Sequence, residues 1–196
     1  MYENKKIILF DGSNLDGWAK RDGSPADWTI EDGIMTVGKD DIVSKVTFGD
    51  ALLHVEFREP DMPLEKGQGK GNSGVYVHGC YEIQVLDSYG VEPPTDSDCS
   101  AIYNMHAPLM NACKPALAWQ TYDILIRAPR FNARGKVKED GRISVFQNGL
   151  PVHNNIILPR ATPGGISDKP VAEGPAMLQD HGDPVSFRNI WVMKLD

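Results

Sequence analysis

Apolar and polar residues alternate with a period of two along much of the chain. Residues 51–58 read ALLHVEFR and residues 121–127 read TYDILIR, so that nearly every second position is apolar. This is the pattern of β-strands with one buried face, because successive side chains of a strand point to opposite sides. No segment combines helical periodicity with helix caps. The pattern therefore predicts an all-β protein.

Two Asx-Gly pairs predict tight hairpins. Asp32-Gly33 and Asn148-Gly149 each separate two strand-like runs, and such pairs supply the positive φ angles of a two-residue turn. Many short strands, with 19 Gly and 14 Pro in the chain, predict an antiparallel sandwich or jelly roll. We expect one such domain over residues 1–196. Long loops that shape a binding site are expected at residues 60–72, 89–118 and 159–175.

Residues 72–87 form the most informative stretch, where two strand-like runs meet at a short turn. Tyr76 and His78 fall on one face of the first run, and Glu82 and Gln84 fall on one face of the second, because side chains alternate across a strand. These groups can form hydrogen bonds and transfer protons. They predict a groove for a small carbohydrate or a similar polyhydroxylated ligand.

Charge and cysteine content narrow the function classes. The net charge of -7 argues against nucleic acid as a partner, and no apolar run is long enough to cross a membrane. No signal peptide is visible, so we expect a cytoplasmic protein; the alternative is a periplasmic or secreted protein whose export signal has been removed. The 3 cysteines lack CxxC spacing, which predicts free thiols, with a Cys99–Cys113 bridge as the alternative.

Short motifs occur in a characteristic order over nearly the whole chain. Taken together, they resemble the 3-keto-disaccharide hydrolase domain family, also described as 3-keto-glucoside lyase/hydratase. That resemblance implies a concanavalin A-like jelly roll of two curved antiparallel sheets with the ligand on the concave face. His78 stands where we expect Arg in many members, which bears on substrate choice. The motifs are LFDGSNLDGW (9–18), WTIEDG (28–33), NSGVY (72–76), YEIQVLD (81–87), APRF (128–131), VFQNG (145–149), LQDHG (178–182) and VSFRNI (185–190).

The resemblance also implies a reaction, the cleavage of 3-keto-glucosides or 3-keto-disaccharides. A carbonyl at C3 makes the C2 proton acidic, so a base can remove it and the anomeric substituent can leave by β-elimination. Hydration of the resulting enone gives a net hydrolysis. This route needs a general base, an acid, and a cation or donor that faces the enolate oxygen. We expect Glu82 and His181 to be the acid–base groups and Arg188 to give electrostatic support.

Each of these residues has an alternative interpretation. Arg188 could instead form a buried ion pair that braces a sheet, and Gln84 could brace Glu82 rather than bind a sugar hydroxyl. A carboxylate in the middle of a strand is costly to bury unpaired, so Glu82 either serves the site or forms a structural ion pair with Arg58 or Arg188. His181 precedes a glycine and could instead be a turn histidine that binds backbone. Gln84 interrupts the alternating carboxylates expected of a jelly-roll glucanase, which speaks against a conventional glycoside hydrolase. A non-catalytic carbohydrate-binding module remains the other alternative.

Further residues are expected to bind substrate. Gln179 shares a strand face with His181 by alternation. His54 and Glu56 join the site only if their strand face is the concave one, since a charged row is commonly a solvated face. The expected substrate-binding residues are Gln84, His78, Tyr76, Asn72, Ser73, His54, Glu56, Tyr103 and Gln179.

A divalent metal ion would stabilise an enolate. Suitable ligand atoms are present on His54 with Glu56, or on His78 with Glu82 and His181. No spacing among them is diagnostic of a metal site, so the sequence assigns no metal ligand and predicts no other cofactor.

Overall fold

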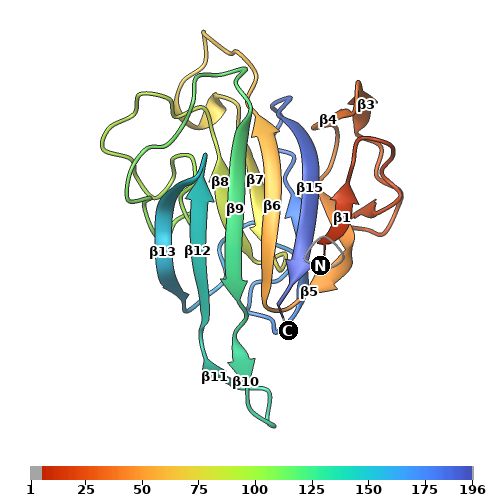
Figure 1. Ribbon diagram of the computed structural model, residues 1–196, viewed down its shortest axis with the longest axis vertical. Coiled ribbons are helices and arrows are strands. Elements are labelled where there is room, and N and C mark those ends of the chain that lie inside the picture. Colours follow the sequence, from red (N-terminus) through yellow and green to blue (C-terminus); the bar gives the residue numbers. More distant parts are fainter. Residues whose placement is uncertain (1–5, 196) are drawn as a thin grey trace.

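Two antiparallel β-sheets packed face to face make up the computed structural model, which describes residues 6–195 (Figure 1). The strands are β1 (Lys6–Phe10), β2 (Trp18–Lys20), β3 (Thr29–Glu31), β4 (Ile34–Thr36), β5 (Ile42–Phe48), β6 (Ala51–Arg58), β7 (Ser73–Val77), β8 (Tyr81–Val85), β9 (Gln120–Arg127), β10 (Arg130–Phe131), β11 (Val137–Glu139), β12 (Gly141–Gln147), β13 (Leu150–Leu158), β14 (Gly174–Leu178) and β15 (Ser186–Lys194).

The larger sheet has eight strands in the order β13-β12-β9-β6-β15-β4-β3, and β1 also pairs with β15. The smaller sheet has five strands in the order β2-β5-β14-β7-β8, while β10 and β11 form a separate two-stranded ribbon. In Figure 1 the larger sheet lies in front and β7 and β8 lie behind it. Strands that are distant in sequence are therefore neighbours in both sheets.

The prediction of an all-β protein is confirmed. Within residues 6–195 there is no α-helix, and the loop before β7 contains one turn of 3₁₀-helix, η2 (Gly67–Gly69). Over the same residues, no helix combines the length and the apolar composition needed to span a membrane.

Both predicted hairpins are present, between β3 and β4 and between β12 and β13. Asp32 and Gly33 have φ angles of 50° and 75°, the left-handed conformation that a tight turn requires. A third hairpin joins β7 to β8, and its turn begins at His78, with a φ of 56°. The expectation that His78 continues the face of its strand is therefore wrong, because the chain has already begun to turn there.

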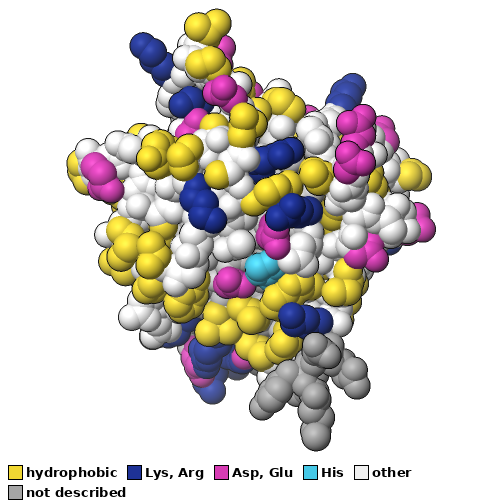
Figure 2. All heavy atoms as spheres, turned by 45° about the horizontal axis from the view of Figure 1, so that its top comes forward, with side chains coloured by type: hydrophobic (Ala, Val, Ile, Leu, Met, Phe, Trp, Pro, Cys, Tyr) yellow, Lys and Arg dark blue, Asp and Glu magenta, His cyan; other side chains and the backbone are white. Residues whose placement is uncertain are grey.

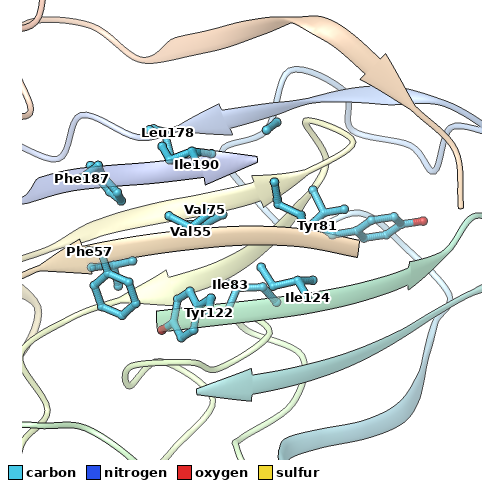
Figure 3. Close-up of a cluster of buried hydrophobic side chains, with 14 of the residues drawn as sticks. Val55, Phe57, Val75, Tyr81, Ile83, Tyr122, Ile124, Leu178, Phe187 and Ile190 are labelled. Atoms are coloured by element: carbon cyan, nitrogen blue, oxygen red, sulfur yellow. The ribbon is translucent and has the colours of Figure 1, made fainter. Parts of the chain in front are cut away.

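The core lies between the two sheets and is formed by one face of their strands, whereas the ribbon of β10 and β11 contributes no residue to it (Figure 3). On β6 the residues at alternate positions from Ala51 to Phe57 are fully buried, while the intervening side chains are only partly buried. On β8 the apolar residues Tyr81, Ile83 and Val85 point into the core. The core side chains labelled in Figure 3 are Val55, Phe57, Tyr122, Ile124, Phe187 and Ile190 of the larger sheet, and Val75, Tyr81, Ile83 and Leu178 of the smaller sheet.

Polar residues of β7 and β8 point away from the core, yet they are buried too, because loops cover them. The backbone N–H of Tyr103 donates to the Glu82 carbonyl at 3.2 Å. The Glu82 N–H in turn donates to the Thr162 hydroxyl at 2.8 Å. The loops after β8 and β13 thus enclose the outer face of the smaller sheet, which is where long loops were expected to shape a site.

The thiols of Cys80, Cys99 and Cys113 are all free, as predicted. Cys99 and Cys113 nevertheless lie close together, since the Gln147 amide nitrogen is 3.5 Å from both sulfur atoms. Burial raises the pKa of the Cys99 thiol well above its ordinary value. Cys99 therefore behaves as a packed, uncharged side chain rather than a reactive thiolate.

Candidate active site

A cleft of about 90 Å³ opens on the outer face of the smaller sheet, over β7, β8 and the end of β14. Its floor is formed by strand residues, and its rim comes from loops that are distant in sequence. The lining residues are Gln68, Asn72, Tyr76, Glu82, Gln84, Tyr103, Pro163, Gly164, Gln179 and His181.

Glu82 is the only carboxylic acid among the described residues that line this cleft. Its side chain is 3% exposed, and the Tyr76 hydroxyl donates to Glu82 Oε2 at 2.7 Å. With the Gln84 amide turned so that its nitrogen faces the carboxylate, it donates to Glu82 Oε1 at 3.0 Å. Both carboxylate oxygens therefore have a donor, and the group is held in one orientation.

Burial is the main cause that raises the pKa of Glu82 to about 7. The hydrogen bond from Tyr76 lowers the pKa, and the nearby negative charge of Asp41 raises it further. A carboxyl group with a pKa near neutrality exchanges protons readily in both directions at physiological pH. Burial also raises the pKa of Tyr76, so its hydroxyl stays protonated and acts as a donor.

Two glycines leave room for this arrangement. A Cβ atom at Gly74 would lie 2.6 Å from Glu82 Oε1, which is too close for any side chain while the carboxylate keeps its position. A Cβ atom at Gly164 would lie 2.5 Å from the Tyr76 hydroxyl, and Gly164 also has a φ of 82°. The geometry of the Tyr76–Glu82 pair thus depends on the absence of side chains at both positions.

A charged group lies directly beside the cleft. Arg21 and Asp41 form an ion pair at 2.7 Å, and the Arg21 guanidinium donates to the Gly164 carbonyl on the cleft rim. Asp41 Oδ1 accepts a hydrogen bond from the Asp180 N–H at 2.8 Å. These residues were not among the sequence candidates, because β2, β5 and β14 bring them together over more than a hundred positions of the chain.

The structure brings most of the predicted site residues together. Glu82 and His181, the expected acid–base groups, line the same cleft. His181 is exposed in the loop after β14, and Gln179 faces the cleft beside it. The predicted substrate-binding residues that also line the cleft are Gln84, Tyr76, Asn72, Tyr103 and Gln179. Gln68 was missed, because nothing in the sequence of its loop indicates which side chain turns inward.

Arg188, His54 and Glu56 lie away from the cleft, so they do not join Glu82 and His181. For Arg188 the structure shows the alternative, an ion pair that braces a sheet. Arg188 forms an ion pair with Glu56 at 2.6 Å, and His54 Nδ1 lies 2.7 Å from an Asp123 carboxylate oxygen. These side chains occupy the outer face of the larger sheet, on the opposite side of the core. Figure 2 views the molecule obliquely from that side and shows one histidine side chain close to acidic and basic ones, with apolar side chains around them.

The alternative role for Glu82 as a structural ion-pair partner is also excluded. Arg58 and Arg188 both stack on Trp119, at 4.8 and 3.9 Å from its ring centre. Because that stack is on the larger sheet, neither guanidinium reaches Glu82.

His78 and Ser73 are near the cleft but do not line it. His78 Nε2 is 2.9 Å from the Gly49 carbonyl oxygen, and its ring packs on Phe48. The Ser73 hydroxyl donates to the backbone carbonyl of Gln179 at 2.7 Å. Both side chains therefore serve the fold around this cleft and do not face a ligand in it, although His78 also lines a neighbouring cavity.

The metal ligand sets considered from the sequence are not assembled. His54 and Glu56 lie on the other sheet, and His78 faces away from Glu82 and His181. Within residues 6–195, no three His, Cys, Asp or Glu side chains are grouped so that they could hold a metal ion.

The chain matches a known protein family over nearly its whole length. The family model described as 3-keto-alpha-glucoside-1,2-lyase-like domain matches residues 5–193. The 3-keto-disaccharide hydrolase of Bacteroides thetaiotaomicron is 25% identical to this chain over an alignment 232 residues long. The alignment covers 97% of this chain and 78% of that protein. An inferred glycosyl hydrolase of Parabacteroides distasonis is 36% identical, with a TM-score of 0.89, and the match covers 97% of this chain and 84% of that one.

More distant solved structures share the fold. A β-1,3-1,4-glucanase (lichenase) from a mouse hindgut metagenome superposes with a TM-score of 0.53 at 13% identity, covering 97% of this chain and 99% of that one. At such identity the likeness concerns the fold alone, and it confirms the concanavalin A-like jelly roll. Together with the match over residues 5–193, these findings show that the chain belongs to the family of 3-keto-alpha-glucoside-1,2-lyase-like domains.

Proposed function

We propose that this protein cleaves 3-keto-glycosides by elimination and hydration, with Glu82 and His181 as the acid–base groups. One observation carries the proposal: among the described residues that line the cleft there is one carboxyl group, burial raises its pKa to about 7, and an imidazole lines the same cleft. Histidine is the other side chain that commonly exchanges protons near neutral pH. The cleft thus offers the two proton-transfer groups that the reaction needs.

The reaction balances without a redox partner. A base removes the C2 proton, and the electron pair of that bond rests on the C3 oxygen as an enolate. When the C3 carbonyl forms again, the electron pair of the enolate moves to make a C1=C2 double bond. The bond between C1 and the anomeric oxygen breaks, and the departing oxygen takes a proton from the acid. Water then adds hydroxide to C1 and a proton to C2, which gives 3-keto-glucose and a free alcohol.

The chain's own residues would support these steps in different ways. Tyr76 and Gln84 hold the Glu82 carboxylate in place. The Gln68 amide nitrogen donates to the Ser97 carbonyl at 2.8 Å. The Gln179 amide also lines the cleft and would supply a donor for sugar hydroxyls or for the developing enolate oxygen. Donors fixed in a partly buried cleft act more strongly than water would, because they need no reorganisation during the reaction.

A conventional glycoside hydrolase is the weaker alternative. Such enzymes use two carboxyl groups on either side of the glycosidic bond, whereas the described lining of this cleft contains Glu82 alone. A carbohydrate-binding module is also disfavoured, because a binding role gives no reason to hold a buried carboxyl group at a pKa of about 7.

The test is to incubate the pure protein with methyl 3-keto-glucoside in D₂O and follow the products by NMR. The proposal predicts methanol release together with deuterium at C2 of the released sugar, because C2 is deprotonated and reprotonated. Methanol release without deuterium at C2 would contradict the elimination route. Turnover of the unoxidised methyl glucoside would support the conventional hydrolase instead.

A further inference from the structure

A second cavity, of about 440 Å³, lies beside the cleft on the same outer face of the smaller sheet. Most of the area of its wall is apolar, and Ala19 from β2 and Val43 from β5 lie on one side. Lys20, Lys45, His78 and Glu173 line it as well. Ile166 and Val171, from the loop between β13 and β14, form the other side, and Pro175 of β14 contributes as well. The cavity is larger than the cleft and differs from it in chemistry.

One loop separates the two cavities. Pro163 and Gly164 line the cleft, whereas Ile166, two residues later, lines the apolar cavity. The Ile166 N–H donates to the Gly79 carbonyl at 2.7 Å, which fixes the loop on the β7–β8 turn. Because Gly164 and the residue after it are glycines, the partition carries no side chain at its centre.

Arg21 contacts the rim of the cleft and also lines the apolar cavity. Its guanidinium donates to the Gly164 carbonyl on that rim. Its ion pair with Asp41 holds it there. A molecule that reached over the glycine partition from the polar cleft would thus meet a cation held in place and then an apolar surface.

The sizes of the two cavities indicate what each would hold. Pockets for drug-sized ligands usually measure about 300–1,000 Å³, so the cleft of about 90 Å³ is too small for a sugar together with a bulky anomeric substituent. That substituent must extend out of the cleft. The apolar cavity is adjacent, and its wall suits a hydrocarbon or an aromatic ring rather than a second hydroxylated sugar.

We propose that the apolar cavity is the subsite for the leaving group, and that this protein prefers 3-keto-glucosides whose anomeric substituent is aromatic or otherwise apolar. The inference rests on the proposed function, because it assigns the group that the elimination expels. Ile166 is then a specificity-determining residue, as it forms the wall nearest the partition and its side chain is 49% exposed.

The test compares benzyl and methyl 3-keto-glucosides of the same anomeric configuration. Both release alcohols of similar acidity, so the chemical step is matched and the difference reports on binding of the ring. We expect the wild-type kcat/KM for the benzyl substrate to exceed that for the methyl substrate about tenfold or more. Ile166→Glu should remove most of this ratio, because it places a charge against the ring. The ratio compares two substrates on one protein, so partial misfolding of the variant cancels.

Leu150→Glu is the matched control. Leu150 is 48% exposed, close to the 49% of Ile166, but it lies on β13 of the larger sheet. That variant should keep the wild-type ratio. A wild-type ratio near one, or a ratio that survives Ile166→Glu, would overturn the subsite while leaving the proposed function intact. Failure of the wild-type protein to cleave either substrate would overturn both.

Discussion

Replacing Glu82 by Gln should stabilise the protein, and the gain should grow as the pH rises. The side chain is 3% exposed, and its burial raises the pKa from an ordinary 4.5 to about 7. Ionising Glu82 is therefore harder in the fold than in the unfolded chain. Gln has a similar shape and no charge to bury, and its amide oxygen still accepts the hydrogen bond from Tyr76. Its amide nitrogen can donate to Gln84 once the Gln84 amide turns so that its oxygen faces position 82.

The direction and the size of this stability change follow from proton binding to Glu82 in the folded and unfolded states. Between pH 4.5 and about 7, the folded protein keeps a proton on Glu82 that the unfolded chain has released. Wild-type stability therefore falls as the pH rises through this window. At about 1.4 kcal/mol for each tenfold change in proton affinity, the loss amounts to about 3 kcal/mol once Glu82 is ionised. Below pH 4.5 the group is neutral in both states, and this contribution vanishes.

Urea unfolding of wild type and Glu82→Gln, from about pH 4 to about pH 9, measures the difference directly. Glu139→Gln is the control of opposite sign. Glu139 is exposed, and its hydrogen bond from Arg127 lowers its pKa, so removing it should cost stability at high pH and not at low pH. If the difference between Glu82→Gln and wild type did not change with pH, Glu82 would not be the buried, hard-to-ionise group described above.

Three further substitutions probe the cleft. Tyr76→Phe removes the hydrogen bond that lowers the pKa of Glu82, so the limb of the pH profile of kcat/KM that reports Glu82 should move to higher pH; a shift to lower pH would contradict the assignment. Gly74→Ala should displace the carboxylate, since a Cβ would lie 2.6 Å from Glu82 Oε1, and should lower kcat about tenfold or more; full activity would show that the orientation of Glu82 is unimportant. Arg188→Ala should leave kcat/KM unchanged, because Arg188 pairs with Glu56 on the other sheet. A large loss of kcat/KM would show that Arg188 takes part in the reaction.

The fold was predictable because its signals are local. Alternation at residues 51–58 and 121–127 identified the core-facing side of each strand, and Asx-Gly pairs located two hairpins. The turn at His78 was misjudged, because a histidine gives no sign that it adopts a left-handed φ of 56°. The order of the strands in the sheets depends on long-range pairing, which no local pattern records.

The site was predictable only in part, for a related reason. Both sheets carry polar side chains on their outer faces. The alternating polar positions around Glu56 on β6 therefore look the same in the sequence as those around Glu82 on β8. What separates them is the covering of loops, which buries Glu82 and leaves Glu56 partly exposed. Gln68, Arg21 and Asp41 approach the cleft through loops and distant strands, and their local sequence gives no indication of it.

The most direct test of the account is the kcat/KM of Glu82→Gln and of Glu56→Gln on methyl 3-keto-glucoside. Both residues are glutamates in strand interiors whose carboxylates accept hydrogen bonds, but they lie on opposite sides of the core. If Glu82 transfers the proton, its replacement should lower kcat/KM about 10²–10⁴-fold, while Glu56→Gln should stay close to wild type. Equal activity of the two variants, or a greater loss from Glu56→Gln, would place the chemistry somewhere other than this cleft.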